Sequence, residues 1–202
     1  MSKTKHTKKI LWAVDPFTTD EAVLKSAAWR IRALTKAVPT KVEPVYVWSG
    51  SRFTPEVPIM PGDKEFIATL QKEAGEAIDR VLTRIDIPGI EPLRILSKPI
   101  ATVREEAGEL VGYAKKVGAD LIVVSSLGRK GIKRWLLGSF AETLSLYSDI
   151  PLFIVHPNWK RTPDFKTILF PTDFSEASLE AFDRLLDFAG EKKSRVTLFH
   201  KV

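Results

Sequence analysis

The sequence contains no cysteine, which excludes disulfide bonds, thiolate metal sites and thiol catalysis. Histidine is scarce too: the three residues, His6, His156 and His200, are scattered, which argues against a histidine-based metal site. Apolar runs such as residues 10–14 fall far short of the ~20 residues that a membrane-spanning helix needs. We therefore expect no membrane association. The lack of cysteine is typical of a reducing compartment, so we expect a cytoplasmic protein.

Positive charge is concentrated in two places instead of being spread along the chain. Lys and Arg total 31 against 25 Asp and Glu, a net charge of +6. Four basic residues fall in the first ten positions and four in residues 128–134, with no acid in either stretch. Without these eight, 23 basic residues face 25 acidic ones, a net charge of −2. A near-neutral body with a disordered basic tail at residues 1–7 and one basic loop disfavours nucleic-acid binding.

Short apolar runs alternate with helical patterns through residues 8–157. Strands are predicted at residues 10–14, 42–48, 93–96, 121–124 and 152–155, and helices at residues 20–37, 64–85, 102–117 and 139–148. This alternation predicts an α/β domain with a doubly wound, five-stranded parallel sheet and helices on both faces. Pro44 lies inside the second strand, so we expect that end to be bulged or at a sheet edge. The proline-rich residues 50–62 are predicted to form a long loop.

The remainder of the chain repeats the beginning of this pattern. A linker is predicted at residues 158–164, and the sequence Ile-Leu-Phe-Pro-Thr-Asp at 168–173 aligns with Ile-Leu-Trp-Ala-Val-Asp at 10–15. A helical pattern at 176–189 and a strand at 195–202 follow. Residues 165–202 are therefore predicted to be a partial second copy, strand–helix–strand, that lacks a glycine-bearing loop of its own.

The loop after the fourth predicted strand is the first candidate for chemistry. It begins at Ser125, contains Gly128 and Arg129, and ends at Gly138 and Ser139, where a helix opens. Glycine lets a backbone approach an anion closely, and a helix amino terminus offers unpaired amides, so this loop is suited to phosphate. In the alternative interpretation the glycines only form a turn and Ser139 only caps the helix.

Asp15 is the second candidate, because it ends the first predicted strand at the same edge of the sheet. Its carboxylate could accept hydrogen bonds from a ribose or an adenine amino group; equally, it could cap the next helix or bind loop amides. No nucleophile and base stand at a convincing spacing, so the sequence does not indicate a committed enzyme.

Several separated segments resemble the universal stress protein family. They are Ala-Asp-Leu-Ile-Val-Val at 119–124, Gly128-Arg129, Gly138-Ser139, Ala141-Glu142, Pro-Leu-Phe-Ile-Val at 151–155, and residues 168–178, which look like that family's opening strand and turn. The family signature G-x2-G-x9-G-[ST] is matched from Gly128 onward. Ser125 stands at the signature's first glycine, and Leu127 at the position usually held by histidine.

The resemblance implies a doubly wound domain that dimerises, often through its last strand. It also implies ATP, with Mg²⁺, as the ligand. By position, Asp15 and Val47 would hold adenine and ribose. Phosphates would lie against Gly128, Arg129, Gly138, Ser139 and the amide of Phe140.

Two functions follow as hypotheses. The first is a tandem-type, ATP-responsive stress module that acts by nucleotide-dependent loop ordering and by contacts in a homodimer or tandem pseudo-dimer, with at most weak ATP hydrolysis. The second is a scaffold that binds no nucleotide and works through dimerisation and protein partners whose identity the sequence does not give.

Overall fold

The computed structural model describes residues 8–18, 20–36, 38–49, 64–98, 101–126, 139–157 and 164–200. The chain divides into two compact units, residues 1–161 and residues 162–202, which we call unit 1 and unit 2. The predicted tail at 1–7, the loop at 50–62 and nearly all of the linker lie outside the described residues.

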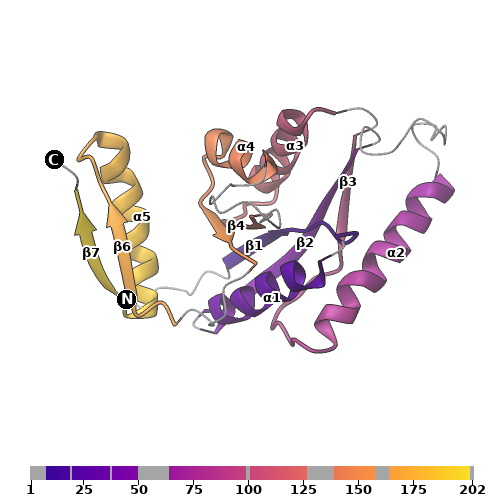
Figure 1. Ribbon diagram of the computed structural model, residues 1–202, viewed down its shortest axis with the longest axis horizontal. Helices are drawn as coiled ribbons and strands as arrows, with labels where there is room; N and C mark the ends of the chain where they lie inside the picture. Colours follow the sequence, from indigo (N-terminus) through magenta and orange to yellow (C-terminus); the bar gives the residue numbers. More distant parts are fainter. Residues whose placement is uncertain are drawn as a thin grey trace. The chain divides into compact units, whose positions relative to one another are not determined.

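Unit 1 contains a single parallel sheet of five strands in the order β3-β2-β1-β4-β5, which confirms the doubly wound prediction (Figure 1). The strands are β1 (Lys8–Ala13), β2 (Thr40–Ser49), β3 (Arg94–Lys98), β4 (Leu121–Ser125) and β5 (Leu152–Val155). Residues 10–13 of β1 and 121–124 of β4 are apolar, as expected where helices cover both faces of the sheet.

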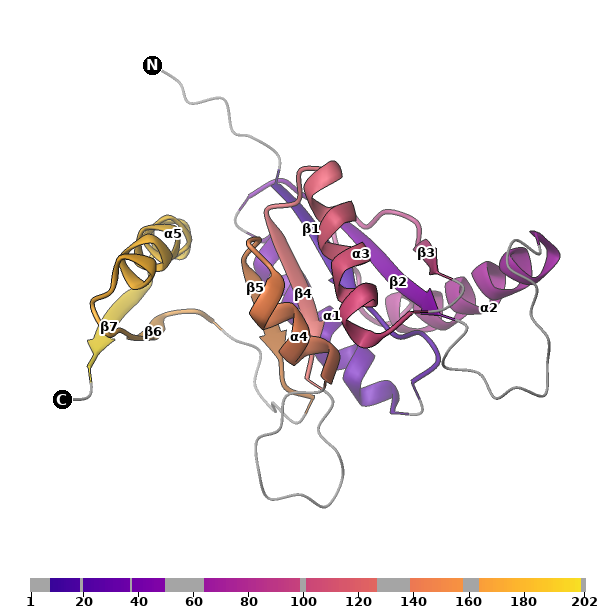
Figure 2. The same cartoon turned by 90° about the horizontal axis from the view of Figure 1, so that it is seen from above.

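Four helices connect these strands: α1 (Glu21–Thr35), α2 (Lys64–Leu82), α3 (Val103–Lys116) and α4 (Ser139–Tyr147). Helices α1 and α2 lie on one face of the sheet and α3 and α4 on the other, as Figures 1 and 2 show together. Local sequence fixes the ends of α3. Thr102 and Glu105 form a capping box at its start, and Gly118 (φ +64°) ends it in a left-handed turn.

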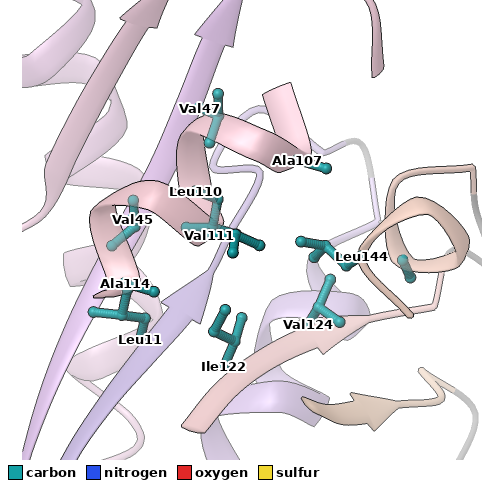
Figure 3. Packing of buried hydrophobic residues seen from close by; sticks show 11 residues of the cluster. Leu11, Val45, Val47, Ala107, Leu110, Val111, Ala114, Ile122, Val124 and Leu144 are labelled. Atoms are coloured by element: carbon teal, nitrogen blue, oxygen red, sulfur yellow. The ribbon is translucent and has the colours of Figure 1, made fainter. Parts of the chain in front are cut away.

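The largest core cluster lies between the sheet and the α3/α4 pair. Leu11 and Ile122 come from the central strands and meet Leu110 of α3 and Leu144 of α4, all with no measurable exposure (Figure 3). On the opposite face, Trp48 of β2 packs against Phe66 of α2, with ring centroids 5.3 Å apart. Because helices cover both faces of the sheet, a ligand can reach the sheet at the ends of its strands.

The expectation of a bulge or an edge at Pro44 is confirmed on the β3 side and wrong on the β1 side. Strand β2 is interior, and its register with β1 runs without a break, pairing Trp12 with Pro44. The proline fits because main-chain groups alternate between the two neighbouring strands. Val42 exchanges hydrogen bonds with Gly89 and Glu91, so the nitrogen of Pro44 faces the same side. There the ladder is interrupted until β3 begins at Arg94.

Unit 2 consists of β6 (Thr167–Pro171), α5 (Glu176–Lys192) and β7 (Arg195–Phe199), with β6 and β7 paired in parallel. Helix α5 packs on one face of this two-stranded sheet, where the rings of Phe170 and Phe182 lie 5.2 Å apart. Ser175 caps the helix and Lys193 (φ 53°) ends it in a left-handed conformation. The predicted strand–helix–strand order is therefore present.

Candidate functional site

The strand order of unit 1 reverses between β1 and β4. From β1 the chain crosses to β2 on one side, whereas β4 and β5 lie on the other side, and β1 and β4 pair directly up to Ala13 and Val124. In open α/β sheets, the crevice outside the carboxyl ends of the strands at such a reversal is where ligands bind. The residues that follow β1 and β4 are therefore the ones to inspect.

Asp15 lies at this edge and is exposed. Its Oδ1 accepts a hydrogen bond from the Phe17 N–H at 3.1 Å, and its carbonyl accepts one from the Thr18 N–H at 3.3 Å. The cap of α1 is Asp20, whose carboxylate accepts from the Ala22 N–H at 3.0 Å. Of the two structural roles open for Asp15, binding loop amides is therefore the one observed, and helix capping is not.

An exposed aromatic ring stands beside Asp15. Phe17 keeps 42% of its surface accessible and meets the buried Tyr46 edge-on, with ring centroids 5.6 Å apart. Sequence reasoning did not propose Phe17 as a site residue. The sequence did contain a signal for Phe17. An aromatic residue that directly follows the Asp-Pro turn at the end of a strand must lie close to the edge of the sheet.

Val47 is enclosed in β2. The residue is 5% exposed and belongs to the α3/α4 core cluster. Val45 O accepts a hydrogen bond from the Val14 N–H at 3.0 Å, and strand alternation turns the N–H of Val47 toward the same side. Contact between Val47 and a ligand stays a prediction.

The other side of the strand reversal begins where β4 ends. Ser125 is half-buried and pairs with Val155. Ser126 is turned inward, and both its N–H and its hydroxyl bond to Val155 O, at 2.8 and 3.3 Å. The predicted phosphate residues Gly128, Arg129 and Gly138 lie outside the described residues.

The chain resumes at the amino terminus of α4. Ser139 is exposed and is the first residue of the helix, while Phe140 packs partly against the core cluster. Backbone N–H groups in a first helical turn have no intrahelical partner, and they carry a partial positive charge. The start of α4 therefore has donors of the kind that phosphate binds.

A buried charged cluster lies away from this edge, and sequence reasoning missed it. Glu43 of β2 accepts a hydrogen bond from Tyr113 Oη of α3 at 2.7 Å, while its other oxygen lies 2.8 Å from Lys9 Nζ. Lys9 also reaches Glu91 at 3.3 Å. Lys9 was counted with the basic tail, but it lies in β1. The available signal was Glu43 itself, because a carboxylate inside a strand that is otherwise mostly apolar needs a charged or hydrogen-bonding partner.

Electrostatics in this cluster stabilise the charged forms of Glu43 and Lys9 and the neutral form of Tyr113. Burial alone would raise the pKa of Glu43, but the hydrogen bonds from Lys9 and Tyr113 outweigh it and lower the pKa. Burial would likewise lower the pKa of Lys9, yet its hydrogen bonds to the two carboxylates raise the pKa overall. For Tyr113, burial and then the bond to Glu43 raise the pKa of the phenol. The cluster attaches α3 to the sheet.

Within the ranges described, no group of three or more His, Cys, Asp or Glu side chains is arranged to hold a metal ion. None of the helices in these ranges has the length and apolar content needed to cross a membrane.

Comparison with known proteins places this geometry in a family. The family model for the universal stress protein family matches residues 6–156. Universal stress protein MJ0531 of Methanocaldococcus jannaschii is 32% identical over 143 residues, covering 70% of this chain and 79% of that protein. Universal stress protein YxiE of Bacillus subtilis is 43% identical over 51 residues, covering 25% of this chain and 34% of that protein.

Solved structures agree on the fold. A universal stress protein from Archaeoglobus fulgidus superposes with a TM-score of 0.66 at 17% identity, covering 95% of this chain; this chain spans 66% of that structure's length. The hypothetical protein MJ0577 superposes with a TM-score of 0.54 at 23% identity, covering 74% of this chain and 95% of its own. Family model, sequence relative and fold agree, and the chain belongs to the universal stress protein family.

Proposed function

We propose that unit 1 binds an adenine nucleotide, ATP, in the crevice between the ends of β1 and β4. The observation that carries this proposal is the exposed carboxylate of Asp15 at the point of strand reversal. A carboxylate accepts hydrogen bonds from ribose hydroxyls or an adenine amino group, and a backbone N–H donates to a ring nitrogen. The exposed ring of Phe17 adds an apolar surface for a base.

The phosphates would extend toward the segment that follows Ser125. Gly128, Arg129 and Gly138 would contact them together with the hydroxyl of Ser139 and the amide of Phe140, as the signature implies. The start of α4 supplies partial positive charge for an anion. Mg²⁺ would arrive on the phosphates of ATP, where phosphate oxygens make up most of its ligands.

The nucleotide would then act as an effector of conformation. Helix α4 begins at the phosphate end of the crevice, and its Leu144 belongs to the core cluster that Ile154 of β5 packs against. Ordering the loop before α4 would therefore alter the packing of β5, which is an edge strand of the sheet. An edge strand has one side of its backbone available for pairing with a second chain. We propose a cytoplasmic protein that dimerises in a nucleotide-dependent way.

The test is isothermal titration of the full chain with ATP and Mg²⁺, together with thermal melting. A ligand at a hundred times its dissociation constant stabilises the folded protein by about 2.7 kcal/mol, so the melting temperature should rise measurably. Asp15→Ala should weaken binding. The matched control is Asp173→Ala, because Asp173 Oδ1 accepts from the Ser175 N–H at 3.0 Å in the same kind of turn in unit 2. If millimolar ATP gives no heat of binding and no shift in melting temperature, nucleotide binding is refuted.

The second candidate is a scaffold that binds no nucleotide. The feature that favours it is Ser125, which stands where the signature has its first glycine and whose side chain would narrow the space for phosphate. In this case Gly138→Asp, which cannot admit phosphate, should leave dimerisation unchanged in analytical ultracentrifugation. If dimerisation changes with Gly138→Asp or with ATP, the scaffold interpretation is overturned.

We also infer that residues 165–202 are a partial second universal stress protein domain, so that the chain is of the tandem type. The support is internal: the Thr172 N–H donates to Phe199 O at 2.9 Å, in the place where the Val14 N–H donates to Val45 O at 3.0 Å. Each bond directly precedes an aspartate whose carboxylate accepts from the residue two positions on. The two units repeat one local geometry.

A further inference from the structure

The turn that follows β1 fixes a carboxylate and an aromatic ring two residues apart. The Thr18 N–H donates to Asp15 O at 3.3 Å, and the Phe17 N–H donates to Asp15 Oδ1 at 3.1 Å. Pro16, the second residue of this turn, is buried, and its ring presets the φ angle that this position of a turn requires. The fold therefore sets the position of the Phe17 backbone relative to the Asp15 carboxylate before any ligand binds.

The ring of Phe17 is only partly covered. Phe17 is 42% exposed, and its ring meets that of Tyr46 of β2 at an interplanar angle of 66° with centroids 5.6 Å apart. An edge-on contact of this kind covers at most one face of the Phe17 ring. Ring surface beside an exposed carboxylate suits a ligand that combines a planar base with N–H or hydroxyl donors, as a nucleoside does.

The strand order gives the proposed site a direction. Strand β2 pairs with one side of β1, and β4, which leads to α4, pairs with the other side. Since the phosphates are proposed to extend toward α4, the opposite end of the ligand would point toward β2. Phe17 stands at this end, because its ring contacts Tyr46 of β2. The base is therefore the part of a nucleotide that would reach Phe17.

Unit 2 contains a similar ring pair in a shorter turn. Phe174 directly follows Asp173, is 59% exposed and lies with its ring centroid 5.0 Å from that of His200. Helix α5 begins three residues after Asp173, whereas α1 begins six residues after Asp15. Phe174 thus matches Phe17 in residue type, exposure and ring contact, but it lies in a unit to which we assign no nucleotide.

We propose that Phe17 stacks on the base of the bound nucleotide and makes the site prefer purines to pyrimidines. This proposal rests on the nucleotide binding proposed for unit 1. The fused rings of a purine offer more apolar surface to the phenyl ring than the single ring of a pyrimidine does, and burial of that surface stabilises the complex. Because the turn already holds the backbone of Phe17 in place, little conformational entropy is lost when the base binds.

The test is isothermal titration of the full chain with ATP and with CTP, each in the presence of Mg²⁺. The two nucleotides share the ribose and the triphosphate, and each base carries one exocyclic amino group, so they differ mainly in ring size. ATP should bind about fivefold more tightly than CTP, or better. Phe17→Ala should weaken ATP binding by about fivefold or more and bring the two affinities close together, whereas Phe17→Trp should keep the preference.

The matched control is Phe174→Ala, which should leave both affinities unchanged, and circular dichroism verifies the fold of each variant. If ATP binds and Phe17→Ala leaves the ratio of the two affinities unchanged, the role of Phe17 is overturned while nucleotide binding stands. The same holds if Phe17→Ala weakens both nucleotides equally, because the ring then acts only on the shape of the turn. If the unaltered protein binds neither nucleotide, both proposals are overturned.

Discussion

The same substitution at two equivalent leucines should have very different effects on stability. Leu11 is fully enclosed between β1 and α3, whereas Leu169 is 63% exposed in the matching position of unit 2. Truncating a buried leucine to alanine costs about 2–5 kcal/mol, because apolar contacts are lost and a cavity remains. For Leu169 only about a third of the side chain is covered, so the cost should be about 1 kcal/mol or less.

Tryptophan fluorescence separates the two units in this experiment. All five tryptophans lie between Trp12 and Trp159, so the signal reports unit 1 alone. With a urea m-value of about 2 kcal/mol per molar, a cost of about 3 kcal/mol for Leu11→Ala lowers the midpoint by about 1.5 M. Leu169→Ala should leave that midpoint within error, while far-UV circular dichroism follows both units.

Two results would refute the reasoning. If Leu11→Ala shifts the tryptophan midpoint by less than about 0.5 M, the core described between β1 and α3 is not the core in solution. If Leu169→Ala lowers the same midpoint as much as Leu11→Ala does, the face carrying Leu169 is covered in a way that supports unit 1. Repeating both titrations at two protein concentrations separates an intramolecular cause from self-association.

Two further predictions concern the rest of unit 1. Because the folded-state pKa of Glu43 is lowered, its contribution to stability is present above the ordinary carboxyl pKa and is lost as the pH falls through the folded value. Glu43→Ala should therefore destabilise by about 2 kcal/mol at pH 7 and by less in acid, measured by urea unfolding across pH; a pH-independent deficit would contradict this. Gly89→Ala should cost roughly 2–4 kcal/mol in thermal unfolding, because Gly89 has φ +74° and a Cβ would lie 2.0 Å from Thr40 O. Gly75→Ala, a helical position with open space around the Cβ, is the control and should stabilise slightly; equal effects at the two glycines would remove the backbone explanation.

Local chemistry alone was enough to place most elements along the chain. The run at residues 152–155 coincides with β5, and Gly118 ends α3 as predicted, because apolar periodicity and glycine at a helix end act over a few residues. The doubly wound order followed from the alternation of strands and helices, since right-handed crossovers leave few topologies. Pro44 predicted a break in strand pairing, but only the tertiary structure shows that the break lies on the β3 side and that the pairing with β1 is continuous.

The amino-acid sequence by itself determined that the protein has no cysteine, and it located the residues that match the family's phosphate-binding signature. The tertiary structure decided what those residues can do. It enclosed Val47, which is 5% exposed, and it joined Lys9, Glu43 and Tyr113 across distant segments. It also left Leu169 bare where the identical Leu11 is sealed. Exposure depends on which helix packs on a strand, and residues far apart in the sequence set that packing.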